Sequence, residues 1–319
     1  MTAQLGVDLA KRKFDAALLK DGKIRNKVFE NTPSGFQQLV EWLARQGATD
    51  VHVCMEATGD YGEALATFLH DAGYTVSMVN PAQIKGFAQS KLLRTKTDKA
   101  DARLIAQFCQ ANTPPAWQPA PPEVRELQAL ARRLDALNEM QRMELNRLET
   151  AHSTIVPSLQ AVLTQLGEQI KLIRQAIRDH IDQHPDLRGK RELLDSIPGI
   201  GEATITQILA YLAHVRFTNA KQVAAFLGLN PRQHQSGSSV RGKARISKTG
   251  DARLRKAFYL PAVVAMRYNP VIRAFSERLL AAGKPRMLVV GAVMRKLAHM
   301  VYGVLKSGQP FNPKLALNA

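Results

Sequence analysis

Four acidic residues in the first 101 positions have the types and the spacing of a magnesium site. They are Asp8, Glu56, Asp98 and Asp101. Asp8 lies inside an apolar run and Glu56 ends another, where a charge is costly unless a cation or a proton compensates it. Asp98 and Asp101 are three residues apart, so on a helix they share one face. Oxygen ligands in such a cluster suit Mg²⁺, and two ions about 4 Å apart can polarise a phosphodiester and orient its attacking oxygen.

Each of these acids also has an ordinary structural explanation when it is taken alone. An isolated Asp in a strand is often a turn acid or half of an ion pair, and Asp98 could be a helix N-cap. The combination of a strand Asp, a strand Glu and a helical Asp-x-x-Asp in one α/β domain indicates a ribonuclease-H-like fold. An actin-like ATPase is the alternative, because Gly6-Val-Asp-Leu-Ala-Lys11 could begin one. That fold needs a second glycine-rich phosphate loop, and the sequence shows none.

The elements that must position the acids are predicted to be strands and helices in alternation. Three strands come first, at 5–10, 14–19 and 23–31. Lys20-Asp-Gly-Lys23 predicts a hairpin turn between the second and the third. Helices and strands then alternate, at 32–47, 51–55, 63–72, 75–79 and 82–108. This order predicts an α/β N-terminal domain with a mixed sheet.

The sequence pattern after residue 113 differs from that of the first domain. The prolines at 114–122 indicate a stiff linker. From Leu127 to Ile181, leucines and isoleucines recur at steps of three and four, as in a coiled coil. We expect two long helices, broken or bent near Pro157, that pack on their own domain or on a partner chain. The predicted domains are residues 1–113, the linker and coiled-coil arm at 114–187, and a mainly α-helical domain at 188–319.

The charge of the chain indicates its class of partner. A net charge of +17 and an isoelectric point near 10.1 favour binding to nucleic acid, with an exported or ribosome-associated basic protein as the alternative. No signal peptide follows Met1, and no apolar run reaches the roughly 20 residues of a membrane span. Cys54 and Cys109 lack CxxC spacing and suit a reducing interior. We therefore expect a cytoplasmic, nucleoid-associated protein with no membrane partner.

Two further segments could contact nucleic acid. Ile197-Pro-Gly-Ile-Gly201 has the form of a helix-hairpin-helix, in which Gly199 and Gly201 let backbone amides approach a phosphate. A plain turn between two helices is the alternative. The segment 232–256 holds eight Lys or Arg residues and one acid. The basic residues that we expect to contact the backbone are Arg241, Lys243, Arg245 and Lys248.

Inside that basic segment, residues 235–242 are small, flexible and polar. They could form a disordered linker or carry a serine nucleophile. A serine nucleophile needs a loop held against phosphate, cations for the developing charge and an acceptor for the hydroxyl proton. Arg241, Lys243 and Arg245 could supply the charge. His234 or a metal-bound hydroxide from another domain could accept the proton, and the sequence does not choose between them.

The order of these motifs resembles that of the insertion-sequence 110 family of transposases. The resemblance runs over essentially the whole chain. The segments that carry it are Gly6-Val-Asp-Leu-Ala-Lys11, Met55-Glu-Ala-Thr-Gly59, Val79-Asn-Pro81, Lys96-Thr-Asp-Lys-Ala-Asp-Ala102, Ile197-Pro-Gly-Ile-Gly201 and Gln235-Ser-Gly-Ser-Ser-Val-Arg-Gly242. These transposases are also called DEDD or bridge-RNA-guided recombinases.

The resemblance implies an architecture and a site. It implies a RuvC-like domain whose acids hold Mg²⁺, a coiled-coil arm, and a C-terminal transposase domain with a catalytic serine. The matching serine is Ser236, with Ser238 and Ser239 as alternatives. The implied partners are donor and target double-stranded DNA, a structured guide RNA and further copies of the chain, as a dimer or tetramer. The acids of one domain would meet Ser236 of another, within one chain or between chains.

Three functions therefore compete at this point. The first is a site-specific DNA recombinase, or transposase, that uses Mg²⁺ and forms a covalent serine–DNA intermediate. The second is a RuvC-type metal-dependent junction nuclease that uses the acids alone. The third is a non-enzymatic basic nucleic-acid-binding protein. A covalent protein–DNA adduct would separate the first from the other two.

Overall fold

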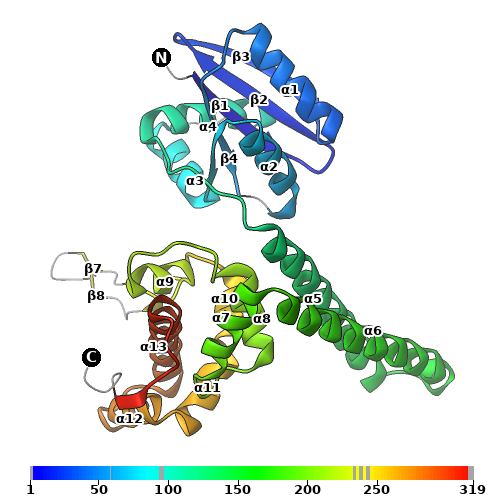
Figure 1. Cartoon of the computed structure of the whole chain (residues 1–319), viewed down its shortest axis with the longest axis vertical. Coiled ribbons are helices and arrows are strands. Elements are labelled where there is room, and N and C mark those ends of the chain that lie inside the picture. Colours follow the sequence, from blue (N-terminus) through cyan, green and yellow to red (C-terminus); the bar gives the residue numbers. More distant parts are fainter. Residues whose placement is uncertain are drawn as a thin grey trace. The chain divides into compact units, whose positions relative to one another are not determined.

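The computed structural model describes residues 3–57, 59–92, 97–232, 235–236, 240–241 and 245–314. The chain divides into two compact units, Met1–Pro119 and Ala120–Ala319 (Figure 1). The predicted arm and the predicted helical domain share the second unit, and their separation into functional parts remains a prediction.

The first unit is built on a five-stranded mixed sheet in the order β3-β2-β1-β4-β5. Its strands are β1 (Ala3–Leu9), β2 (Lys13–Lys20), β3 (Lys23–Glu30), β4 (Val51–Glu56) and β5 (Thr75–Val79). The first three are antiparallel, whereas β4 and β5 run parallel to β1. Asp21 and Gly22 both have positive φ, as the predicted hairpin turn requires. The mixed sheet is confirmed, and its strand order is that of a ribonuclease-H-like domain.

Helices cover both faces of this sheet. One face packs on α1 (Pro33–Arg45) and on α2 (Glu63–Asp71), which follows the short 3₁₀ helix η1 (Gly59–Gly62). The other face packs on α3 (Pro81–Ser90) and α4 (Asp98–Asn112). The prediction of one helical region at 82–108 is therefore wrong. Leu92 takes a φ of 53° just after α3, and the Thr97 side chain caps α4 by accepting a hydrogen bond from the Ala100 amide.

The start of the proline segment belongs to the first unit. The Trp117 amide donates to the Val76 carbonyl at 2.6 Å, and the Ser77 hydroxyl donates to the Pro115 carbonyl at 2.8 Å. These bonds hold residues 115–117 against the last strand of the sheet. The assignment of residues 114–122 as a stiff linker remains a prediction.

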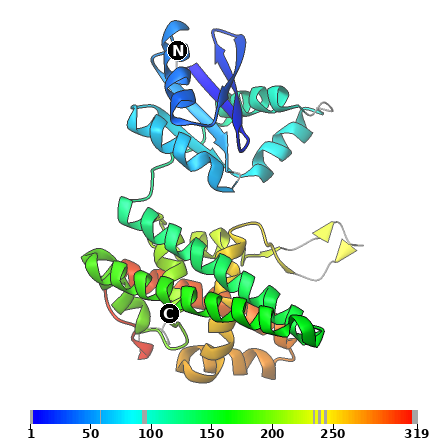
Figure 2. The ribbon, with the colours of Figure 1, turned by 90° about the vertical axis from the view of Figure 1, so that its right-hand side faces the viewer.

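The second unit begins with two long antiparallel helices, α5 (Pro122–Glu149) and α6 (Val156–Gln183), which run side by side (Figures 1 and 2). The break between them spans residues 150–155 and includes the 3₁₀ helix η2 (Ser153–Ile155). Pro157 lies in the first turn of α6, where its missing amide costs no hydrogen bond. The two long helices are confirmed, and their assignment as a coiled coil remains a prediction.

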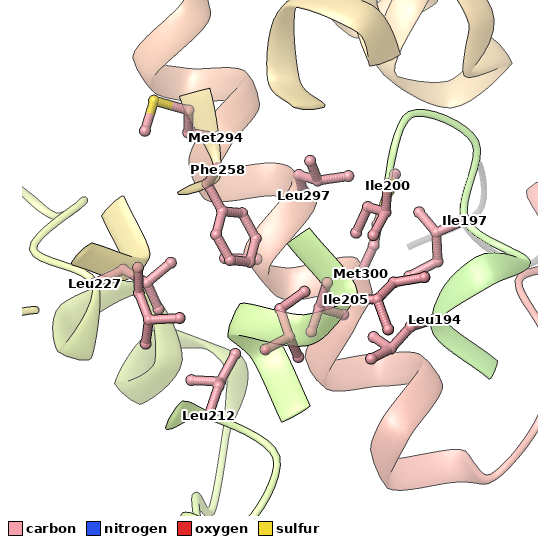
Figure 3. Packing of buried hydrophobic residues seen from close by; sticks show 14 of the residues in the cluster. Leu194, Ile197, Ile200, Ile205, Leu212, Leu227, Phe258, Met294, Leu297 and Met300 are labelled. Carbon is pink, nitrogen blue, oxygen red and sulfur yellow. The ribbon is translucent and has the colours of Figure 1, made fainter. Parts of the chain in front are cut away.

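The remaining helices of the second unit share one core with α13 (Arg286–Ser307). They are α7 (Pro185–Asp195), α8 (Glu202–Tyr211), α9 (Ala220–Phe226), α10 (Ala252–Ala257), α11 (Tyr259–Tyr268) and α12 (Pro270–Ala281). Leu297 and Met300 of α13 pack with Phe258, Ile197 and Ile200 in one core (Figure 3). Among the described residues, α13 is also the one helix long and apolar enough to cross a membrane. Half of its apolar window is buried, as in a central core helix.

Candidate active site

Strand alternation explains why the predicted acids converge on one face of the sheet. Gly6 and Cys54 face α4 from β1 and β4. Side chains two residues apart on a strand point the same way, so Asp8 and Glu56 face the same side. Both lie toward the carboxyl ends of their strands, and these ends meet because β1 and β4 are parallel neighbours. Two of the four acids are thus positioned by the sheet alone.

The other two acids come from the first turn of α4, and Gly6 lets that helix approach. A Cβ atom on Gly6 would lie 2.1 Å from the Ala102 carbonyl oxygen and 2.2 Å from the Ala106 nitrogen. No side chain fits in that space, so the backbone of α4 rests directly on β1. Asp98 is the first residue of α4 and not its N-cap, which is Thr97. The alternative explanation of Asp98 as a capping residue is therefore wrong.

The acids lie close enough for their charges to act on Asp8. Burial, followed by the charges of Asp101, Asp98, Glu56 and Asp15, raises the pKa of Asp8 to about 6. Burial disfavours the carboxylate because it loses solvation, and nearby like charges disfavour it further. All four predicted acids therefore belong to one electrostatic cluster.

A fifth acid and a lysine join this cluster, and the sequence analysis missed both. Asp15 pairs with Asp8 across β1 and β2 and is 8% exposed. Lys13 places its Nζ 2.9 Å from Asp98 Oδ2 and 3.5 Å from Asp15 Oδ2. The hydrogen bond from Lys13 lowers the pKa of Asp98. The signal that could have found Asp15 is the one that found Asp8, an acid inside an apolar strand.

The donor chemistry of the cluster fits a hard divalent cation. Burial and the charges of the neighbouring acids favour the protonated form of Asp8, and carboxylate oxygens are the ligands that such a cation prefers. Within the described part of the chain, no three His, Cys, Asp or Glu side chains are grouped closely enough to hold a metal ion as they stand. The acids thus lie on one face, and their role as metal ligands remains a prediction.

The predicted serine loop contains a β-hairpin in the second unit. Its outer strands are β6 (Pro231–Arg232) and β9 (Arg245–Ile246), and its inner strands are β7 (Gln235–Ser236) and β8 (Val240–Arg241). Ser236 pairs with Val240 across the inner strands. The side chains of Ser236 and Arg241 lie outside the described residues, as do His234, Ser238, Ser239 and Lys243. The described residues of this loop thus form two short antiparallel strand pairs.

The base of this hairpin is clamped by Arg255, a residue that the sequence analysis did not single out. Its Nη1 donates to the Leu227 carbonyl at 3.1 Å and to the Lys248 carbonyl at 3.2 Å. Gly250 makes the close approach possible, because a Cβ there would lie 2.4 Å from the Phe226 carbonyl oxygen. The side chains of Lys248 and of Arg245, at the start of β9, are exposed. The two chain ends that carry the hairpin are thus held together.

The predicted helix-hairpin-helix is formed by α7, residues 196–201 and α8. Gly199 has a φ of +103°, and a Cβ there would lie 2.8 Å from the Cβ of Ala265 on α11. Packing therefore explains this glycine without a phosphate. Gly201 precedes α8 and has no atom within 4 Å of an added Cβ. Contact of Gly199 and Gly201 with a nucleic-acid backbone remains a prediction.

Comparison with known proteins decides the family. A family model of the IS110 DEDD type, described as transposase, matches residues 5–157. A second model, described as transposase of the IS116/IS110/IS902 family, matches residues 191–277. The pilin gene-inverting protein of Moraxella bovis is 33% identical over 98% of both chains. The chain belongs to the IS110 family of transposases.

The two matched regions of this IS110-family transposase contain the two candidate sites. The first region includes all four predicted acids, and the second includes the helix-hairpin-helix and the serine hairpin. Members of the family cleave and rejoin DNA, so the protein is a DNA transposase or recombinase. The DEDD family and its RuvC-like fold imply dependence on a divalent metal.

Other similar proteins agree with the assignment. A probable family 20 transposase of Pseudomonas aeruginosa is 27% identical over 82% of this chain and 86% of its own length. A solved structure of T. thermophilus RuvC with a Holliday junction substrate covers 37% of this transposase and 100% of that chain, at 16% identity and a TM-score of 0.29. An overlap at this level adds nothing to the family assignment.

Proposed function

We propose that the protein is a site-specific DNA recombinase in which an acidic cluster binds metal and a serine acts as the nucleophile. The observation that carries the proposal is the convergence of Asp8, Glu56, Asp98 and Asp101 on one face of the sheet. Burial, and then the charges of the neighbouring acids, raise the pKa of Asp8 to about 6. Half-buried Asp8 lies among four other carboxylates, which is costly to folding, and binding of a cation by these acids would offset that cost.

The acids are the proposed ligands of Mg²⁺, and Ser236 is the proposed nucleophile. Bound Mg²⁺ would supply Lewis-acid polarisation of the phosphate. The Ser236 oxygen attacks phosphorus, a serine–phosphate bond forms, and the DNA oxygen leaves as a free hydroxyl after taking up a proton. A hydroxyl of the second DNA strand then attacks the same phosphorus and releases the serine. No phosphodiester is lost, so the exchange needs no external energy source.

The basic residues around the hairpin are proposed to hold the phosphate. Arg245 and Lys248 are exposed, as a backbone contact requires. With Arg241 and Lys243, they would neutralise the phosphate and favour the charge that develops as the serine attacks. The Arg255 clamp would keep Ser236 in register with them, because it fixes both ends of the hairpin. The proton of the Ser236 hydroxyl would pass to a base, for which His234 is the candidate in the loop.

The proposed partners are donor and target DNA duplexes, a structured guide RNA and further copies of the chain. The net charge of +17 supports a polyanionic partner. The Moraxella bovis relative is named for inverting a pilin gene, which supports DNA as a partner. A dimer or tetramer would let the acids of one chain meet Ser236 of another.

The test is recombination of a DNA substrate together with recovery of protein-linked DNA after denaturation. Wild type with guide RNA and Mg²⁺ should form product and adduct, and omission of the RNA should abolish both. Ser236→Ala should lose the adduct. Asp8→Asn and Asp101→Asn should lose strand exchange, whereas the matched control Asp21→Asn, in the exposed hairpin turn, should retain it. Intact exchange by both acid variants would refute the metal site.

A metal-dependent junction nuclease is the second candidate. It is favoured by the fact that all four acids lie in the first unit and could act without the serine. The same assay separates the two functions. Full cleavage by Ser236→Ala, with no adduct in wild type, would establish the nuclease and reject the serine nucleophile.

A further inference from the structure

Lys13 gives the acidic cluster a cation of its own. It is the first residue of β2, and its ammonium bridges Asp98 at 2.9 Å and Asp15 at 3.5 Å. A divalent ion that bound Asp98 would meet this ammonium at the same carboxylate. Lys13 must therefore either compete with the metal for Asp98 or move away from that carboxylate.

The two acids that Lys13 bridges differ in their freedom to move. The Asp15 side chain is 11% exposed and is anchored in the sheet opposite Asp8, so it has one well-defined position. The Asp98 side chain is 58% exposed at the start of α4, so its rotamer can change at little cost. Lys13 thus has a fixed partner in Asp15 and an exchangeable one in Asp98.

We propose that Lys13 is an internal counter-ion that the divalent metal displaces from Asp98. In the metal-free protein the lysine neutralises Asp98 and holds the first turn of α4 toward the sheet. When the metal takes Asp98, Lys13 remains on Asp15. This inference rests on the proposed function, because it requires the acids to bind a divalent cation. Lys13 is then a positioning residue and not a metal ligand.

Electrostatics sets the direction of the effect. A divalent ion and an ammonium that share one carboxylate repel each other, so Lys13 lowers the affinity of the cluster for metal. Two unit charges about 5 Å apart in water change an equilibrium constant by a factor of about four, and the metal carries two charges. Removal of the Lys13 charge should therefore raise metal affinity on the order of tenfold at low salt, and by less at physiological salt.

The experiment titrates Mn²⁺ into the full-length protein and measures its affinity by calorimetry or by electron paramagnetic resonance. Lys13→Met should bind Mn²⁺ on the order of tenfold more tightly than wild type, and Lys13→Arg should stay within about twofold of it. Lys23→Met is the matched control. It changes the net charge equally but lies at the far end of the β2–β3 hairpin, where Lys20 pairs with Lys23. It should leave the affinity unchanged.

A second variant tests the role of Asp15. Asp15→Asn should weaken Mn²⁺ binding for two reasons. It removes one negative charge from the cluster, and it leaves Lys13 with Asp98 alone, so that the lysine competes more strongly with the metal for Asp98. In the Lys13→Met background the same change removes only the charge, so its effect should be smaller. Equal effects in both backgrounds would show that Asp15 does not hold Lys13. That result would overturn the proposal that Lys13 remains on Asp15 when the metal takes Asp98.

The outcomes separate this inference from the proposed function. If Asp8→Asn abolishes Mn²⁺ binding but Lys13→Met binds no more tightly than wild type, the inference is wrong and the metal site stands. If neither wild type nor Lys13→Met binds Mn²⁺ in a manner that depends on Asp8, the proposed metal site is wrong and the inference falls with it.

Discussion

Replacement of Asp8 by asparagine should stabilise the metal-free protein while it abolishes recombination. The pKa of Asp8 is raised from 3.8 to about 6, chiefly by burial and then by the neighbouring acids. A shift of about two units corresponds to about 3 kcal/mol at neutral pH. Because Asp8 is only half-buried, solvent screening reduces that figure, and we expect Asp8→Asn to raise the free energy of unfolding by about 1–2 kcal/mol at pH 7.5.

The pH dependence of this gain has a definite sign. The native state holds the Asp8 proton more tightly than the unfolded state, so the charged carboxylate costs stability above about pH 6. Below about pH 4 Asp8 is protonated in both states, and the cost disappears. The advantage of Asp8→Asn should therefore be full at pH 7.5, shrink between pH 6 and pH 4, and vanish below that. Saturating Mg²⁺ should reverse the order, since it stabilises only the protein that binds it.

The assay is urea unfolding of the full-length protein followed by tryptophan fluorescence. Trp42 and Trp117 are the two tryptophans of the sequence, and both pack in the first unit. Their emission therefore reports the unfolding of the unit that holds the acids. Asp21→Asn is the control, because it makes the same chemical change at an exposed turn. A loss of stability in Asp8→Asn at pH 7.5, or a gain that persists at pH 4, would refute the electrostatic reasoning.

Three further changes test the packing that builds the two sites. Gly6→Ala should lower the free energy of unfolding of the first unit by at least about 3 kcal/mol, because the new Cβ meets the backbone of α4; tryptophan fluorescence in urea measures it. Gly199→Ala should cost about 1–3 kcal/mol in the second unit, measured by circular dichroism. Ala265→Gly in the same chain should recover part of that loss, and no recovery would show that the contact is not the cause. Arg255→Met should keep the helical content and lower recombination by about tenfold or more, because two bonds worth about 2 kcal/mol hold the hairpin. Lys256 is exposed, so Lys256→Met should recombine DNA as wild type does. Equal losses of recombination in both variants would show that the loss of a positive charge, and not of the hairpin clamp, causes the effect.

The sheet and the predicted acids could be found from the sequence because their signals are local. The Asp-Gly turn and the alternating apolar strands predict the hairpin of β2 and β3, and the structure has both. Asp8 and Glu56 were found because an acid inside a buried strand needs an explanation. Their convergence follows from strand alternation, which can be counted along the chain.

The features that the sequence analysis missed depend on contacts between distant segments. Asp15 carries the same local signal as Asp8, but its place opposite Asp8 depends on the register of β1 against β2. The contact between Lys13 and Asp98 joins residues that are 85 positions apart. The packing of Gly199 against Ala265 joins residues that are 66 positions apart, and the predicted phosphate contact of Gly199 stays a prediction. Arg255 is one of several basic residues in its segment, and only its two carbonyl partners distinguish it.

The most direct measurement identifies the residue that becomes attached to DNA. Wild-type protein is incubated with guide RNA, Mg²⁺ and substrate DNA, denatured and digested with trypsin, and the nucleotide-bearing peptide is sequenced by mass spectrometry. Residues 233–241 form one tryptic peptide with three serines, so fragmentation distinguishes Ser236 from Ser238 and Ser239. We expect the nucleotide on Ser236, and its loss in Asp101→Asn. Complete DNA cleavage without any nucleotide-bearing peptide, or a nucleotide on a residue outside this hairpin, would contradict a serine nucleophile served by the acidic cluster.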